Sequence, residues 1–267
     1  MSAVSLSLWD LALAASLVLI HAGLSLALQL GLGRQIVLAV IRMVIQLALL
    51  GVVLEVLFTR TSPWLTALAA AVMILFAGRE AVARQGRKFA GPWGYGIGTS
   101  AILASATLVT IFALTTQVQS DPWFNPRYAI PLLGMVLGNT MTGVALGLNT
   151  LTTTARRDKG GIEAQLALGA SIWVAMRPTL REAMRSGMLP IINAMAATGL
   201  VSIPGMMTGQ ILAGAAPADA IRYQLLIMFL IAGGTGLGVF AAVYAGARRL
   251  TDQRHRLRLD RLAGMEG

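Results

Sequence analysis

The sequence contains no cysteine, which excludes disulfide bonds, thiolate metal sites and cysteine nucleophiles. Its only lysines are Lys88 and Lys159, and neither ends a glycine-rich G-x-x-x-x-G-K-[ST] loop that would hold nucleotide phosphates. The H-E-x-x-H motif of metalloproteases and the G-x-S-x-G motif of hydrolases are also missing. We therefore expect no catalytic residues and no ATPase site in this chain. If the protein moves a substrate uphill, the energy must come from elsewhere.

Charged residues are scarce as well. They make up 12% of the 267 residues, against about 25% in a typical soluble domain, and the mean hydropathy is +0.73. A membrane-spanning helix needs roughly 20 mostly apolar residues. Segments that approach this pattern cover residues 8–30, 36–58, 64–76, 95–115, 129–151, 188–212 and 221–245. We predict an all-α polytopic membrane protein with about seven transmembrane helices in a single domain, residues 1–267.

The net charge of +10 gives the orientation of these helices. The basic residues lie between apolar segments rather than in one patch, so we expect no nucleic-acid partner. If the N-terminus faces outside, only Arg60, Arg127 and Arg222 fall in external segments and Arg42 within a span. All other Lys and Arg residues then fall on the cytoplasmic side, as the positive-inside rule requires. The prediction is an external N-terminus and a cytoplasmic C-terminus.

Two of the apolar segments carry glycines at four-residue spacing. Such spacing lets helix backbones approach closely in a membrane. The pairs are Gly134 with Gly138, Gly143 with Gly147, and Gly234 with Gly238. We interpret them as helix-packing positions rather than ligand contacts.

Acidic side chains within apolar segments are few. Asp10 and Glu55 both fall near the outer ends of their predicted helices. They are either interface residues that reach water or an acidic outer mouth that favours a departing cation. The sequence leaves both interpretations open.

The segment at residues 188–212 mixes apolar and polar residues in a way that indicates a broken transmembrane helix. Pro204 lacks the backbone N–H that a regular helix needs and is flanked by glycines, so the backbone can kink there. Met206 and Met207 offer thioethers that suit softer metals, although methionine is also ordinary core filler. The predicted translocation pathway comprises Asn139 from the preceding segment and Asn193, Ser202, Pro204, Met206, Met207, Thr208 and Gln210.

The polar segment before this helix, residues 156–186, resembles the loop by which ABC permeases dock on their ATPase. Glu163-Ala164 and, after four residues, Gly169-Ala170-Ser171 are similar to the E-A-A…G pattern of that loop, with Gln165 in place of the second alanine. The run from Gly199 to Leu212, GLVSIPGMMTGQIL, is more distinctive. It resembles the FetB-type family of ABC permeases, which includes bacterial iron exporters and plant permeases related to aluminium tolerance.

This resemblance implies a single permease domain in the bacterial inner membrane, working as a homodimer with a separate ABC ATPase subunit. ATP and Mg²⁺ would bind to that ATPase, and the cargo would be iron or a related metal cation. The short cytoplasmic helix carrying Glu163, Ala164, Gly169 and Ala170 would lie in a groove of the ATPase. Alternatives are a permease for a sugar nucleotide or other organic solute, a gradient-driven secondary transporter, and a non-transporting scaffold.

Overall fold

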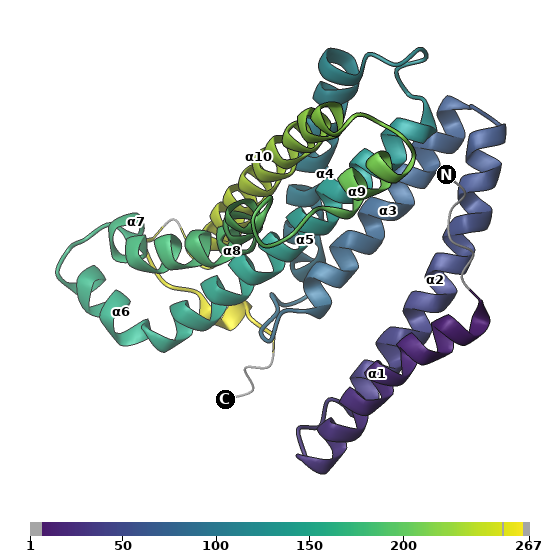
Figure 1. The fold of residues 1–267 in the computed structure, drawn as a ribbon. Coiled ribbons are helices and arrows are strands. Elements are labelled where there is room, and N and C mark those ends of the chain that lie inside the picture. Colours follow the sequence, from purple (N-terminus) through teal and green to yellow (C-terminus); the bar gives the residue numbers. More distant parts are fainter. Residues whose placement is uncertain (1–6, 253, 264–267) are drawn as a thin grey trace. The chain divides into compact units, whose positions relative to one another are not determined.

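The computed structural model describes residues 7–252 and 254–263, and these form helices joined by short connections (Figure 1). Within these ranges, extended pairing is limited to isolated bridges. The helices are α1 (Leu8–Ala27), α2 (Gly33–Thr59), α3 (Pro63–Ala83), α4 (Trp93–Ala113), the π-helix η1 (Leu114–Val118), α5 (Pro126–Arg157), α6 (Lys159–Ala167), α7 (Ile172–Ala175), α8 (Arg177–Ala197), α9 (Gly205–Leu212), α10 (Pro217–Arg249) and the 3-10 helix η2 (Leu259–Arg261).

Local sequence signals explain where these helices begin. Pro63, Pro126 and Pro217 stand at the start of α3, α5 and α10, where the missing N–H is not needed. Ser7 and Asp10 form a reciprocal capping box at the start of α1. Asn125 accepts a hydrogen bond from the backbone N–H of Arg127 at 3.1 Å and caps α5.

Six helical segments in the described part of the chain are long and apolar enough to cross a membrane: Trp9–Ala27, Gly33–Thr59, Pro63–Ala83, Trp93–Val118, Pro126–Arg157 and Pro217–Arg249. They correspond to six of the seven predicted segments. The other predicted segment, 188–212, is not one helix, because α8 ends at Ala197 and α9 begins at Gly205. The polytopic membrane fold is therefore confirmed, whereas seven spans and an external N-terminus stay predictions.

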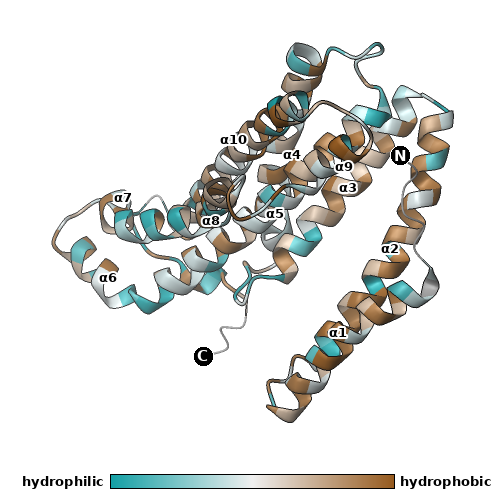
Figure 2. Ribbon diagram, viewed as in Figure 1, coloured by the Kyte–Doolittle hydropathy of each residue, from teal (hydrophilic) through white to brown (hydrophobic). Residues whose placement is uncertain are grey.

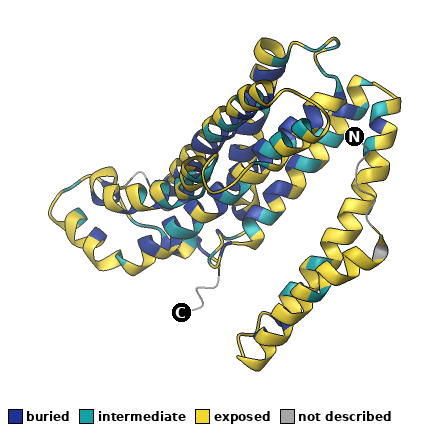
Figure 3. Ribbon diagram, viewed as in Figure 1, coloured by how far each residue is buried: buried dark blue, intermediate teal, exposed yellow. Residues whose placement is uncertain are grey.

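The chain divides into two compact units. The first comprises the chain up to Thr61 together with Leu212–Gly214, and the second comprises Ser62–Ile211 and Ala215–Gly267. In the first unit, α1 and α2 form a hairpin whose turn is closed by a hydrogen bond from the Leu32 N–H to the buried Ser25 hydroxyl, at 3.1 Å. Most of their side chains are apolar, and most are exposed (Figures 2 and 3). Lipid is the solvent that suits such a surface.

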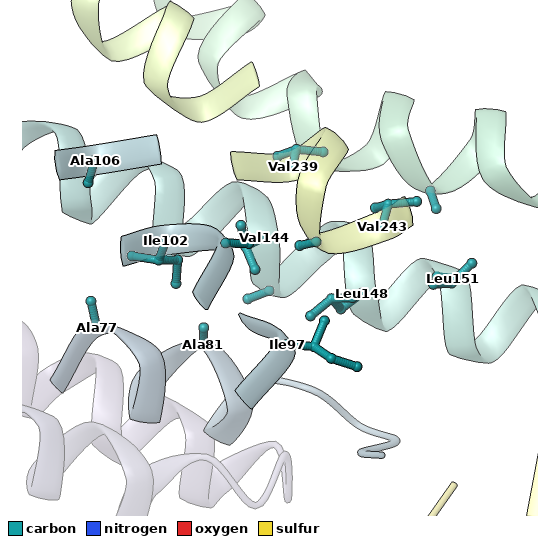
Figure 4. Packing of buried hydrophobic residues seen from close by; sticks show 14 of the residues in the cluster. Ala77, Ala81, Ile97, Ile102, Ala106, Val144, Leu148, Leu151, Val239 and Val243 are labelled. Atoms are coloured by element: carbon teal, nitrogen blue, oxygen red, sulfur yellow. The ribbon is translucent and has the colours of Figure 1, made fainter. Parts of the chain in front are cut away.

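The second unit is a helix bundle organised around α5, which contacts α3, α4, α8 and α10. Its core is built mainly from aliphatic side chains, including Ile102 on α4, Val144 and Leu148 on α5, and Val239 and Val243 on α10 (Figure 4). These five side chains are buried completely or almost completely. As the glycine spacing predicts, Gly143 and Gly147 on α5 face α8 and α10 at close range. Gly138, in contrast, has open space where a β-carbon would lie.

The described residues after α10 fold back over the basic end of the bundle, and we call residues 250–252 and 254–263 the C-terminal segment. Its Phe89–Leu262 bridge joins it to the α3–α4 connection, with the Ala90 N–H bonded to the Arg261 carbonyl at 2.8 Å. The Arg258 guanidinium bonds to Asp260 at 2.7 and 2.9 Å and lowers the pKa of that carboxyl to about 2. The Asp252 carboxylate accepts a hydrogen bond from the backbone N–H of Arg256, and this bond is the main reason why its pKa is lowered. Both carboxylates therefore stay charged at neutral pH.

Candidate functional site

The predicted coupling residues lie on a helical hairpin formed by α6 and α7. Glu163 and Ala164 are exposed on α6, and Glu163 pairs with Lys159 one turn earlier at 3.7 Å. Glu163 lies in the middle of α6, whose N-cap position is Asp158, so it does not cap the start of the helix. An exposed pair of this kind contributes at most about 1 kcal/mol, so the carboxylate remains available to a partner.

The turn between α6 and α7 explains Gly169. The Ala170 N–H bonds to the Gln165 carbonyl and the Gly169 N–H to the Leu166 carbonyl, both at 3.0 Å, which is a Schellman motif. Gly169 has φ +88°, a conformation that glycine adopts without strain. Space for a β-carbon is open there, so within this chain Gly169 is required by its backbone conformation and not by close approach.

The base of the hairpin is fixed while its tip is free. Ile162, Ile172 and Met176 are buried against the bundle, and Trp173 stacks on Tyr244 of α10 with ring centroids 5.2 Å apart. Leu168, at the tip, is 88% exposed. Sequence reasoning missed Leu168, although its place between α6 and the Gly169 turn could have indicated it. The arrangement is a projection with a packed base and an apolar tip, and it carries the exposed Glu163 carboxylate earlier on α6.

The break between α8 and α9 is a hydrogen-bonded loop of residues 198–204. Gly199 has φ +90°, and its N–H bonds to the Ser202 carbonyl at 2.9 Å. The N–H groups of Val201 and Ser202 both bond to the Ala197 carbonyl, at 2.9 and 3.2 Å. The broken helix is confirmed, but its cause differs from the prediction. Pro204 directly precedes α9 instead of interrupting a helix, and the chain turns at Gly199.

The predicted pathway residues differ in their surroundings. Asn139, Asn193, Ser202 and Thr208 are exposed, and the Asn139 side-chain amide donates to the Met135 carbonyl at 2.9 Å. Met206 is half-buried against the hydrophobic core, and Met207 is also half-buried. The side-chain oxygen of Gln210 is buried, and no hydrogen-bond partner for it is found among the described residues. A buried oxygen in this state is available to a cation or to water.

The loop 198–204 also exposes large apolar side chains that sequence reasoning did not single out. Leu200 is 93% exposed and Val201 85% exposed, with Ile203 also exposed. Their exposure could not be recognised from hydropathy, because apolar residues predominate throughout this stretch.

The predicted outer acidic residues belong to the first unit. The carboxylate of Asp10 accepts hydrogen bonds from the Ser7 N–H and hydroxyl at 2.8 Å each, which gives it a capping role. Glu55 is exposed on α2. The described residues contain no group of three His, Asp or Glu side chains close enough to hold a metal ion.

Comparison with known proteins gives a consistent result. The model of the "Uncharacterised protein family (UPF0014)" matches residues 8–251. The chain is 32% identical to the probable iron export permease protein FetB of Escherichia coli over 93% of both chains. It is 35% identical to a UPF0014 membrane protein of Synechocystis, over 81% of this chain and 83% of that one. It is 33% identical to the UPF0014 membrane protein STAR2 of rice, over 86% and 79%. No solved structure matches the chain significantly.

Proposed function

Because the chain belongs to the UPF0014 family of membrane proteins, we propose that it is the membrane-spanning permease subunit of an ABC transporter that exports iron or a related metal cation. The observation that carries this proposal is the similarity to a relative named as a probable iron export permease over nearly the whole of both chains. ATP and Mg²⁺ would bind to a separate ATPase subunit, and the complex, not this chain, would be the ATP-driven translocase.

The α6–α7 hairpin supports the ATPase partnership. Its tip offers the exposed apolar Leu168, α6 carries the exposed Glu163 carboxylate, and the base is held by buried side chains. A projection that is rigid at its base can transmit the movement of a partner to the bundle. The predicted orientation places it in the cytoplasm of a bacterial cell, under the inner membrane, where ATP is present.

Exposed residues of the α8–α9 loop and of the two helices that it joins support a homodimer. Ser202, Leu200 and Val201 are exposed in the loop, Asn193 is exposed on α8 and Thr208 on α9. Polar and apolar groups together on a surface within the membrane suit an interface between two copies with a polar pathway along it. Oxygen ligands from both copies, with Met206 or Met207 as a softer ligand, would then complete a site that one copy lacks.

The alternative cargoes differ in what they require. A sugar nucleotide or another organic solute would need a larger polar cavity than a metal cation does. A gradient-driven transporter would need a titratable carboxylate near the middle of the membrane. Among the described residues in the six candidate spans of the fold, Asp10, Glu55, Glu80 and Asp219 are the acidic side chains, and all lie towards helix ends. This distribution favours the ATP-driven mechanism.

The proposal is tested by measuring ATPase activity of the permease reconstituted with its ATPase in lipid. Fe²⁺, Zn²⁺, Mn²⁺ and a sugar nucleotide are compared as stimulants. We expect stimulation by one of the metals and none by the sugar nucleotide. Stimulation by the sugar nucleotide alone would contradict the proposed cargo, and failure to associate with any ABC ATPase would contradict the proposed class.

A further inference from the structure

A cavity of about 620 Å³ lies at the C-terminal end of α10, beside the base of the α6–α7 hairpin. Its lining comes from three parts of the second unit: α7, the end of α10 and the C-terminal segment. The lining residues are Ile172, Trp173, Arg248, Thr251, Asp252, Arg254, His255, Arg256 and Arg261. Its volume is within the range of small-molecule sites, which is about 300–1,000 Å³.

The charge of this cavity is strongly positive. Arg248, Arg254, Arg256 and Arg261 line it, against the single carboxylate of Asp252. Asp252 is already paired with Arg256 at 2.8 Å. In the described part of the chain, no carboxylate lies within ion-pair distance of Arg248 or Arg254. These two guanidinium groups are therefore uncompensated, and the hydrogen bonds of a third, Arg261, go to backbone carbonyls rather than to a carboxylate.

Two of the basic groups, those of Arg248 and Arg261, are held in place by the surrounding structure. Arg248 lies over the Tyr244 ring at 5.9 Å, and Tyr244 is itself stacked on Trp173. Arg261 donates from one guanidinium nitrogen to the carbonyls of Arg249 and Thr251, at 2.8 and 3.2 Å. Such fixation reduces the conformational entropy that a ligand would otherwise have to overcome.

His255 adds a donor of a different kind. Its Nδ1 accepts a hydrogen bond from the Ile172 N–H at 3.4 Å. In the neutral imidazole the proton must then be on Nε2, which makes Nε2 a hydrogen-bond donor. The cavity thus combines guanidinium groups with an imidazole N–H, and this set of donors is complementary to phosphate oxygens.

We propose that this cavity binds the phosphate group of an anion, either an anionic phospholipid headgroup or a soluble phosphate compound. The cavity follows directly after α10, a candidate membrane span, so a lipid headgroup can reach it. Basic pockets at the cytoplasmic ends of membrane helices commonly bind such headgroups. The ligand would connect α7 to the C-terminal segment, and this inference does not depend on the cargo or on the ATPase.

The test uses the purified full-length permease alone. Native mass spectrometry compares retention of phosphatidylglycerol and cardiolipin with that of phosphatidylcholine, and titration calorimetry compares inorganic phosphate and pyrophosphate with chloride. The double variant Arg248→Gln/Arg254→Gln is matched by Arg84→Gln/Arg156→Gln, which removes two exposed arginines from the same end of the bundle. Circular dichroism and size-exclusion chromatography check the folding of both.

We expect about 30-fold weaker phosphate or anionic-lipid binding in the first double variant, from about fivefold for each arginine near a membrane surface, and little change in the control. Binding should also slow hydrogen exchange at residues 172–175 and 254–256 in the wild-type chain. Specific retention of the anionic lipids identifies a headgroup as the ligand, and binding of phosphate or pyrophosphate alone identifies a soluble one. Equal losses in both double variants, or no binding of either ligand type, would overturn the proposal. If Arg248→Gln/Arg254→Gln fails to fold, the single variant Arg254→Gln provides the same comparison against Arg84→Gln.

Discussion

Gly143 on α5 and Gly187 on α8 face each other so closely that neither position can accept a β-carbon without movement. A β-carbon on Gly187 would lie 2.7 Å from the Gly143 carbonyl oxygen, and one on Gly143 would lie 2.9 Å from the Gly187 carbonyl oxygen. The contact joins the central helix of the bundle to the helix that leads from the α6–α7 hairpin to the α8–α9 loop. Helix α8, held against α5 by this contact, is therefore the direct connection between the hairpin and the loop.

The first prediction follows from this contact. Gly187→Ala should lower the free energy of unfolding by about 1–3 kcal/mol, because the added methyl group must displace backbone atoms. Gly138→Ala, on the same α5 but with open space around the β-carbon, should change it by less than about 1 kcal/mol. Unfolding of the two purified variants, followed by tryptophan fluorescence, makes the comparison. Equal effects would show that the close contact does not determine the packing.

The second prediction concerns the tip of the hairpin. Leu168→Gln should abolish association with the ATPase while the permease remains folded, because Leu168 contributes little to packing in the chain alone. Gly160→Ala, at the other end of α6 and also in open space, is the control and should leave association intact. Copurification with the ATPase is the measurement. Wild-type association of Leu168→Gln would remove Leu168 from the docking surface.

Gly169 gives a third, separable prediction. Gly169→Val should impair coupling, since φ +88° is strongly disfavoured for a β-branched residue, whereas Gly169→Asn should retain most of it, because asparagine tolerates the left-handed region. Metal-stimulated ATP hydrolysis by the reconstituted complex distinguishes the two. If both variants behave alike, the backbone conformation of the turn is not what coupling requires.

The fourth prediction tests the pathway at the α8–α9 loop. Gln210→Leu should impair export or change the metal preference, because it removes a buried side-chain oxygen that has no protein partner among the described residues. Pro204→Ala should reduce export less than the loss of a helix-kinking proline would. The reason is that Pro204 precedes α9 and Gly199 makes the turn. Export of each metal by vesicles containing either variant is compared with wild type. Normal export and selectivity in Gln210→Leu would leave this loop as a packing element only.

Much of the fold could be predicted from the sequence because lipid imposes a simple rule on length and hydropathy. Six of the seven predicted spans correspond to helices, and the glycine spacing correctly indicated that Gly143, Gly147 and Gly238 lie at close helix contacts. Gly138 shows the limit of that reasoning. Spacing alone does not say which side of a helix faces a neighbour, so Gly138 matched the pattern without a contact.

The candidate site was only partly predictable. Proline at position 204 indicated a break, but a proline constrains only its own φ and the preceding turn. The break is at Gly199, which adopts the left-handed conformation, whereas Gly205 and Gly209 lie in α9. The sequence alone does not show which of these three glycines makes the turn. Likewise the cavity beside Arg248 and Arg254 depends on how the C-terminal segment folds back, and that path is set by long-range contacts such as Phe89 with Leu262.

The central claim, that this chain is the permease of an ATP-driven metal exporter, is tested most directly by transport into inside-out membrane vesicles. The vesicles contain the permease with its ABC ATPase, and uptake of radioactive Fe²⁺ is measured with ATP and with a non-hydrolysable analogue. We predict ATP-dependent accumulation of iron in the vesicles, lost in Leu168→Gln and retained in Gly160→Ala. Accumulation that proceeds equally without ATP hydrolysis, or that is absent for every metal tested while an organic solute is transported, would contradict the account.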